Sequence, residues 1–400
     1  MLLIAVAVLA GFAWYVMSPA ERTKTVRTVV MIVRRLIDSA RKQPGKVTPF
    51  DAALQERTPR VLVTPALLAL NLIVFLLMLV GSGSLSNPDT LMAWGGSFGP
   101  STSNGQWWRL VTSMFVHAGF FSLVVNLIGL AQVASLLERM TGHLTLAAVY
   151  VATGVIAGLV NLSLDPVTVQ VGATGAVLGV YGLLGASLTW GLLNRSLIVP
   201  FAALKPLAPA AGIFLLYVVA GGIAWTAAVA ALAAGLIGGL VLTRGITEHK
   251  PPAQRLAAAV AATMVIAAAA AVPLRGMAFV KPEIGRVVEV EQRTAETYAK
   301  AAAQFRTGRI QSGALAQLIE RTIVPELHAA NVRISGLERV PHTQQPLVAD
   351  TVEYLRLREE SWQFRARALR SSSMVALRDA DRREFVALEA FKKITPEEVK

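Results

Sequence analysis

The chain has 400 residues, of which 54% are hydrophobic and 16% charged, and its mean hydropathy is +0.54. This composition excludes an ordinary soluble globular protein. The absence of cysteine excludes disulfides and thiolate chemistry, and the five histidines lack metal-ligand spacing, so we expect no metal site and no cofactor. The net charge of +13 raises nucleic-acid binding as a weaker interpretation, because the positions of the charges fit a membrane protein better.

Long apolar runs predict helices that cross a membrane. A helix of about 20 residues spans about 30 Å of hydrocarbon, and runs of this length indicate helices rather than a barrel. In chain order the runs lie at 1–18, 61–81, 110–136, 144–164, 172–193, 206–222, 224–243 and 257–275.

The first run begins at Met1, and its positive charges follow it rather than precede it. This order predicts a retained anchor with its N-terminus outside; a cleaved signal peptide is the alternative. Residues 22–60 are rich in Lys and Arg, which predicts a cytoplasmic location. Within them, 24–42 fits equally an amphipathic helix on anionic lipid or a solvated linker.

Counting spans from this segment places the basic loop 244–255 inside and residues 277–400 outside. The tail has nearly balanced charges and apolar residues at helical spacing, so we expect a small helical bundle with breaks near Gly308, Gly313, Gly336 and Pro346. The predicted domains are an anchor with a basic segment (1–60), a membrane core (61–243), a loop with an extra helix (244–276) and an extracytoplasmic helical domain (277–400).

Residues 107–190 carry a series of short motifs. In order, they are Trp108-Arg109, Phe115-x-His117-x-Gly119, Asn126, Glu138-Arg139-x-x-Gly142 and Gly172-Ala173-Thr174-Gly175. In this order and at these spacings they resemble the rhomboid family of intramembrane serine proteases. The resemblance implies an all-α polytopic membrane protein with a six-helix transmembrane core. To this the chain adds an N-terminal and a C-terminal transmembrane helix and a small soluble helical domain.

The resemblance also exposes three departures at the positions that carry the family's chemistry. Thr174 stands in place of the nucleophilic serine, and Ser122 in place of a histidine that would line the oxyanion pocket with Asn126. Aligning Gly235 and Gly239 with the family's glycines puts Ala228 at the position of the catalytic histidine. The glycine pairs Gly175/Gly179 and Gly235/Gly239 predict close helix packing whether or not chemistry survives.

No base is evident in the sequence beside this position. Residues 206–243 contain no His, Lys, Arg, Asp or Glu, and Tyr217 is their only ionisable side chain. His117 is the remaining candidate base, and we interpret it as structural. We expect the Thr174 hydroxyl to bond back to a carbonyl three or four residues earlier, as threonine does in helices.

We therefore predict a catalytically inactive rhomboid-like pseudoprotease that binds transmembrane segments of client proteins. Two alternatives stay open: an active endopeptidase that uses Thr174, and a membrane scaffold that shares only the fold. The expected partners are membrane lipids and client segments, without nucleic acid, and the expected location is a bacterial inner membrane. The sequence does not predict an oligomeric state.

Overall fold

The computed structural model describes residues 49–81, 84–194, 199–244 and 250–395, and the chain divides into two compact units, Met1–Arg275 and Gly276–Lys400. The described residues form helices and their connections, with one isolated β-bridge between Ser97 and Gln170. The predicted all-α class is confirmed. The apolar run 1–18, the basic segment as far as 48, and His249 lie outside the described residues.

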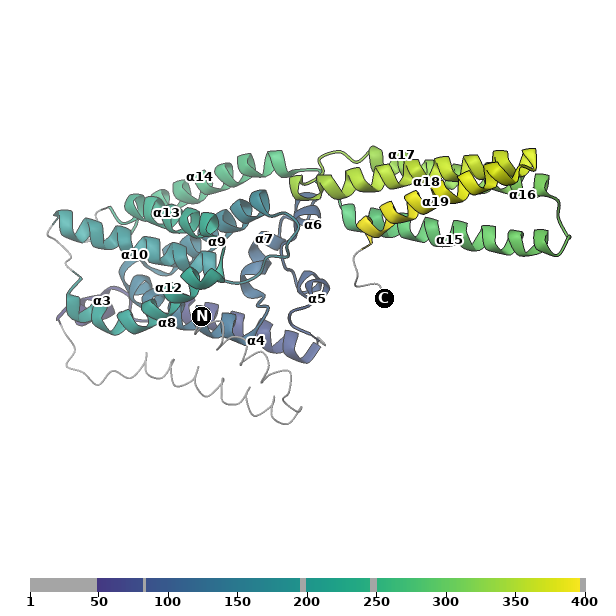
Figure 1. The fold of residues 1–400 in the computed structure, drawn as a ribbon. Helices are drawn as coiled ribbons and strands as arrows, with labels where there is room; N and C mark the ends of the chain where they lie inside the picture. Colours follow the sequence, from purple (N-terminus) through teal and green to yellow (C-terminus); the bar gives the residue numbers. More distant parts are fainter. Residues whose placement is uncertain (1–48, 82–83, 195–198, 245–249, 396–400) are drawn as a thin grey trace. The chain divides into compact units, whose positions relative to one another are not determined.

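The first unit contains the membrane helices (Figure 1). Six described stretches are long and apolar enough to cross a bilayer, which confirms the prediction of a polytopic membrane protein. The long helices are α4 (Val63–Gly81), α8 (Phe120–Thr141), α9 (His143–Leu164), α10 (Thr174–Asn194), α12 (Ala208–Tyr217), α13 (Trp225–Leu242) and α14 (Ala253–Ala271). Shorter helices are α3 (Pro49–Arg57), α5 (Pro88–Ala93), α6 (Gly99–Ser103), α7 (Arg109–Thr112) and α11 (Phe201–Leu204).

The span expected at 110–136 was wrong at its start. The short helix α7 and a 3₁₀ turn, η1 (Ser113–Phe115), come first; the chain is then extended at Val116 and Gly119, and α8 begins only at Phe120. Leu110, Met114 and Val116 are buried in the protein. The apolar character of this segment therefore comes from a loop packed into the core and not from a lipid-facing helix.

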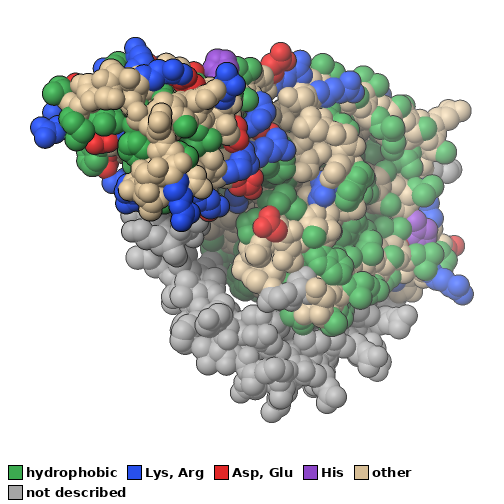
Figure 2. All heavy atoms as spheres, turned by 90° about the vertical axis from the view of Figure 1, so that its right-hand side faces the viewer, with side chains coloured by type: hydrophobic (Ala, Val, Ile, Leu, Met, Phe, Trp, Pro, Cys, Tyr) green, Lys and Arg blue, Asp and Glu red, His purple; other side chains and the backbone are tan. Residues whose placement is uncertain are grey.

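The outer surface of the first unit is itself apolar. Large hydrophobic side chains on several of its helices are at least half exposed, among them Ile73 on α4 and Val229 and Ile237 on α13. Figure 2 shows hydrophobic side chains over much of the visible surface of this unit. Such a surface suits contact with lipid, because hydrocarbon and not water then covers it.

The second unit is a helical bundle. Its helices are α15 (Val280–Arg306), α16 (Ser312–Leu318), α17 (Val324–Ser335), α18 (Gln345–Ser371) and α19 (Met374–Ile394). The chain breaks at Gly308, where φ is +70°, and at Gly336, as expected. Gly313 instead lies inside α16, and Pro346 sits in the first turn of α18, where proline is tolerated because that N–H has no helical partner.

A π-helical turn, η5 (Ile319–Ile323), joins α16 to α17 without a break. Leu315, Ile319, Ile323 and Leu327 recur every four residues, and each is at most 1% exposed. In an α-helix four residues turn about 400°, so a stripe at this spacing drifts by about 40° at each step. The wider π turn compensates for this drift and keeps the stripe facing the core.

Buried charges join three helices of the bundle. Arg358 on α18 pairs with Glu291 on α15 at 2.7 Å and with Glu384 on α19 at 2.8 Å, and the Tyr354 hydroxyl donates to Glu291 at 2.6 Å. Burial alone would lower the pKa of Arg358, but its bonds to the two carboxylates raise it. The guanidinium stays charged because each buried charge has a partner.

Candidate active site

The sequence Gly172-Ala173-Thr174-Gly175 forms the turn into α10. Gly172 has φ +111°, a left-handed conformation that favours glycine, and its N–H donates to the Ser113 carbonyl at 2.8 Å. Thr174 is the first helical residue and is 4% exposed. The turn thus fixes the threonine at the buried start of a membrane helix, tied to the loop before α8.

The Thr174 hydroxyl makes no hydrogen bond with any described residue. The bond to a preceding carbonyl that we expected is not formed, because residues before the first helical position are not helical and do not present their carbonyls along the axis. A Cβ placed on Gly172 would lie 3.9 Å from both the Thr174 and the Ser122 hydroxyl oxygens. The two hydroxyls therefore flank Gly172.

Ser122 and Asn126, the two expected oxyanion-pocket positions, are linked to other groups. The Ser122 hydroxyl accepts a hydrogen bond from the Tyr217 hydroxyl at 3.2 Å. Asn126 donates from Nδ2 to the Ser122 carbonyl at 2.8 Å, and its buried Oδ1 has no partner among the described residues. One Asn126 amide proton is therefore engaged within α8, and the Tyr217 hydroxyl of α12 occupies one acceptor site of the Ser122 hydroxyl. Tyr217 therefore belongs to this polar group, which the sequence did not predict.

Tyr217 is held where α12 gives way to a π turn, η3 (Val218–Gly222). Gly221 in that turn has φ +100°, and a Cβ on Gly222 would lie 2.3 Å from the Tyr217 ring. The ring also packs edge-on against Phe121, with centroids 5.8 Å apart. Two glycines therefore let the chain fold back closely over the tyrosine.

Helices α10 and α13 approach almost backbone to backbone. A Cβ on Gly235 would lie 2.1 Å from the Gly179 carbonyl oxygen, and one on Gly239 would lie 2.7 Å from the Ala186 Cβ. Because higher numbers on α10 oppose higher numbers on α13, the two helices run parallel. Glycine at these positions is therefore required by space.

This register relates Ala228 to Thr174. Ala228 precedes Gly235 by seven residues, about two turns and ~10.5 Å, so it lies on the same face of α13. Thr174 precedes Gly179 by five residues, ~7.5 Å, so the two positions lie at similar levels along the interface. Ala228 is 5% exposed, and its side chain ends at a methyl group. The neighbouring core positions on α13 are Ala227 and Ala231, both fully buried.

The expected face formed by Gly175 and Gly179 is directed at α9. A Cβ on Gly175 would lie 2.5 Å from the Ala157 Cβ, and one on Gly179 would lie 1.9 Å from the Thr153 hydroxyl. Toward α13, the missing side chain that matters is that of Gly182, whose Cβ would lie 2.4 Å from the Leu232 carbonyl oxygen. Three glycines, and not two, therefore allow close packing of α10: Gly175 and Gly179 against α9, and Gly182 against α13.

The described histidines lie elsewhere. His117 is fully buried in the loop before α8; its Nδ1 lies 3.3 Å from the Phe115 carbonyl, and its Nε2 has no partner among the described residues. Burial lowers the pKa of His117 to about 4, which makes it a weak base. His143 contacts Glu138, and His328 contacts Glu359 in the second unit. In the described part of the chain, no group of acidic and histidine side chains is arranged to hold a metal ion.

Comparison with known proteins identifies the family. A family model described as "Rhomboid domain" matches residues 104–248. These residues belong to the rhomboid family. The match begins before α7 and ends beyond α13, so it contains Thr174, Ala228 and the helix interface between them.

Similar curated proteins support the same family assignment. The chain is 29% identical over 178 residues to "Rhomboid protease GluP" of Bacillus subtilis, covering 44% of this chain and 34% of that protein. It is 39% identical over 82 residues to "Putative rhomboid protease YdcA" of the same species, covering 20% and 41%. It is 33% identical over 113 residues to "Rhomboid-like protease 3" of Toxoplasma gondii, covering 28% and 43%. The matches span less than half the length of these relatives.

The Trp-Arg motif of the rhomboid domain orders the loop between α4 and α7. Arg109 donates from Nη1 to the carbonyls of Met92 and Gly96, the latter at 2.9 Å, and its guanidinium lies over the Trp108 ring at 4.7 Å. Trp108 is 52% exposed. The arginine therefore holds this loop in place through bonds to its backbone carbonyls.

The Glu-Arg-x-x-Gly motif joins three helices. The Glu138 carboxylate is fully buried and accepts bonds from the backbone N–H groups of Leu62, Val63 and Thr64 at 2.7 to 2.8 Å. It thereby caps the start of α4 with a negative charge, where the helix dipole favours one. Arg139 donates to the Thr58 carbonyl, and Gly142, at φ +91°, connects α8 to α9.

Proposed function

We propose that the protein is a catalytically inactive rhomboid-like membrane protein that binds transmembrane segments of client proteins. The observation that carries this proposal is the α13 position opposite Thr174, where Ala228 presents only a methyl group. A hydroxyl is a weak nucleophile at neutral pH and needs a base within hydrogen-bond reach. Loss of one member of a catalytic set lowers kcat on the order of 10⁴–10⁶-fold.

The residues at the expected oxyanion-pocket positions also support the proposal that the protein is inactive. An oxyanion donor contributes about 3–4 kcal/mol to the transition state when its N–H or O–H is free to reach the developing charge. Ser122 accepts from Tyr217, and Asn126 donates within its own helix. The Ser122 O–H and the second Asn126 N–H remain as donors, but the short serine side chain reaches less far than the histidine that it replaces.

Client binding is proposed from the surface around the site. Leu216 and Val219 near the end of α12, and Trp225 and Val229 at the start of α13, are between 54% and 61% exposed. This apolar surface suits a second transmembrane helix, since two apolar helices in lipid associate through close packing and not through exclusion of water.

One observation favours the second candidate, an active endopeptidase that uses Thr174. Its hydroxyl has no hydrogen-bond partner among the described residues and is therefore not committed to a structural role. A base would have to come from the substrate, from water or from outside the described residues.

Paired variants of the purified full-length protein test the proposal. We expect no labelling by a fluorophosphonate probe and no cleavage of a panel of transmembrane substrates by the natural chain. Labelling or cleavage that disappears in Thr174→Ala would establish the active candidate. Photo-crosslinking from position 229 in membranes should then capture single-pass proteins; if it captures only lipid, client binding is wrong.

A gain-of-function pair tests whether the site geometry survives. We expect Thr174→Ser with Ala228→His to acquire labelling, whereas Thr174→Ser with Ala227→His should not, because Ala227 points about 100° away around α13. Equal activity of the two pairs would refute the proposed register. Equal silence, with both proteins still folded by melting temperature, would favour a scaffold that keeps only the fold.

The proposed orientation places the N-terminus outside, residues 22–60 in the cytoplasm and residues 277–400 outside, in a bacterial inner membrane. The chain contains no cysteine, so single cysteines report sidedness directly. Ser335→Cys and Lys250→Cys both replace exposed residues. A membrane-impermeant maleimide should label intact cells at 335, and at 250 only after lysis; the reverse pattern would invert the topology.

A further inference from the structure

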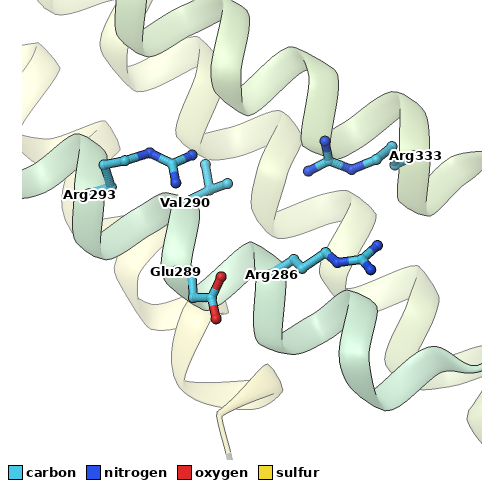
Figure 3. A pocket seen from close by; sticks show the side chains of 5 residues that line it. All are labelled: Arg286, Glu289, Val290, Arg293 and Arg333. Atoms are coloured by element: carbon cyan, nitrogen blue, oxygen red, sulfur yellow. The ribbon is translucent and has the colours of Figure 1, made fainter.

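An open groove in the second unit is lined mainly by arginine. It has a cavity volume of about 380 Å³ and is bordered by Arg286, Glu289, Val290 and Arg293 of α15 and by Arg333 of α17. The α15 residues are spaced at i, i+3, i+4 and i+7, so they share one face of that helix. Figure 3 shows the Arg333 side chain extending from α17 toward α15.

The three guanidinium groups are only partly neutralised. Arg286 pairs with Glu283 through Nη1, and Arg293 donates from Nε and Nη2 to a single oxygen of Glu326, at 3.0 and 2.8 Å. Arg333 has no acidic partner among the described residues. Each arginine therefore keeps N–H donors that face no carboxylate, and three like charges share one groove.

We propose that this groove binds a phosphate group, as a lipid headgroup or as a soluble phosphate compound. A carboxylate has two oxygens and suits one guanidinium, whereas a phosphate offers more acceptor oxygens and a higher charge to several guanidiniums at once. Arg333 supplies the donors with no competing partner, and Arg286 and Arg293 supply the rest from the opposite helix.

The carboxylate of Glu289 allows a test in which a substitution should strengthen anion binding and not weaken it. Glu289 is exposed, borders the same groove and makes no ion pair with the described residues. It repels a bound anion across the groove, so its neutralisation should strengthen binding. If the groove served only to link α15 and α17 through charge pairs, neutralisation of Glu289 would not strengthen the binding of an anion.

The experiment uses the full-length protein in an uncharged detergent, with inorganic phosphate and a short-chain phosphatidylglycerol as probes in calorimetric titrations. We expect Arg333→Gln to weaken binding about fivefold, as for one exposed charge-assisted hydrogen bond, and Glu289→Gln to tighten it. Arg306→Gln, on the same helix but outside the groove, is the matched control and should bind as the natural chain does. Raising the NaCl concentration should weaken binding.

The two probes separate the sources of the phosphate. Binding of phosphatidylglycerol alone identifies a lipid headgroup, and binding of inorganic phosphate identifies a soluble compound; either supports the groove if Arg333→Gln weakens it. The proposal is overturned if neither probe binds at 10 mM, or if Arg333→Gln and Arg306→Gln behave alike. It is also overturned if only an acidic peptide binds in an Arg333-dependent way, since that would make the groove a protein contact. These outcomes do not depend on whether Thr174 is catalytic.

Discussion

Substitution of Gly235 by alanine tests the helix interface on which the site depends. The added Cβ would lie 2.1 Å from the Gly179 carbonyl oxygen and 2.7 and 2.8 Å from two further backbone atoms of Gly179. Ordinary contact begins near 3.4 Å, so α10 and α13 must separate locally by about 1.3 Å. No side chain can relieve these contacts by moving aside, because the three nearest atoms all belong to the backbone of Gly179.

Overpacking of this kind costs about 1–3 kcal/mol, and more where backbone must move. Alanine regains up to ~1 kcal/mol of helix propensity, which leaves a net loss of about 2 kcal/mol. For a unit of this size that loss lowers the melting temperature by roughly 4–8 °C. We expect this shift in thermal unfolding of the detergent-solubilised protein.

The control lies three residues away on the same helix. Gly238 has no atom within 4 Å of its added Cβ, so Gly238→Ala should melt at or slightly above the temperature of the natural chain. The reasoning would be refuted if the two variants melted within about 1 °C of each other, since the propensity terms are equal and only the contact differs.

Three further predictions concern buried polar groups. Glu138→Gln should destabilise the protein by about 2–3 kcal/mol in the same melting assay, because a neutral amide replaces the charged cap of α4; an unchanged melting temperature would contradict that role. Arg358→Leu should lower the melting temperature strongly, by about 3–5 kcal/mol of stability, while Arg356→Leu, in an exposed pair two residues away, should leave it nearly unchanged. Because burial depresses the pKa of His117 to about 4, the unfolded chain binds a proton below pH 6.5 and the folded chain does not, so stability should fall by about 3 kcal/mol between pH 6.5 and pH 4. His117→Asn should lose less over this range in pH-dependent melting, and an identical profile would contradict the assignment.

Much of the fold could be predicted from the sequence because lipid imposes a length and an apolar character on each span. The start of α8 could not, since Leu110 and Val116 are as apolar in a buried loop as in a membrane helix. The turn between α18 and α19 at Ser372, with φ +49°, was also not predicted, because this left-handed conformation is usual for glycine and uncommon for serine.

The candidate site was predicted in part. The motif spacing identified Thr174, Ser122 and Asn126, which lie near one another because α8 and α10 pack together. The partners of these residues could not be predicted: the Tyr217 contact depends on the π turn after α12 and on Gly222. The directions of the glycines on α10 likewise depend on which helices surround it, and periodicity alone does not specify neighbours.

The π turn in the second unit should be visible in comparisons of related sequences as a difference of one residue in the length of this helix. It makes the stretch from Leu315 to Leu327 one residue longer than a plain α-helix with the same buried stripe would need, which is the mark of a single-residue insertion accommodated without a break. Deleting one residue between 319 and 323 would restore regular winding and leave the downstream residues facing as they do now, because the π turn absorbs the roughly 100° that one residue adds. Leu327 and Ile334 would then stay in the core, whereas a deletion inside α17 itself, where no wider turn compensates, would rotate the residues after it by about 100°.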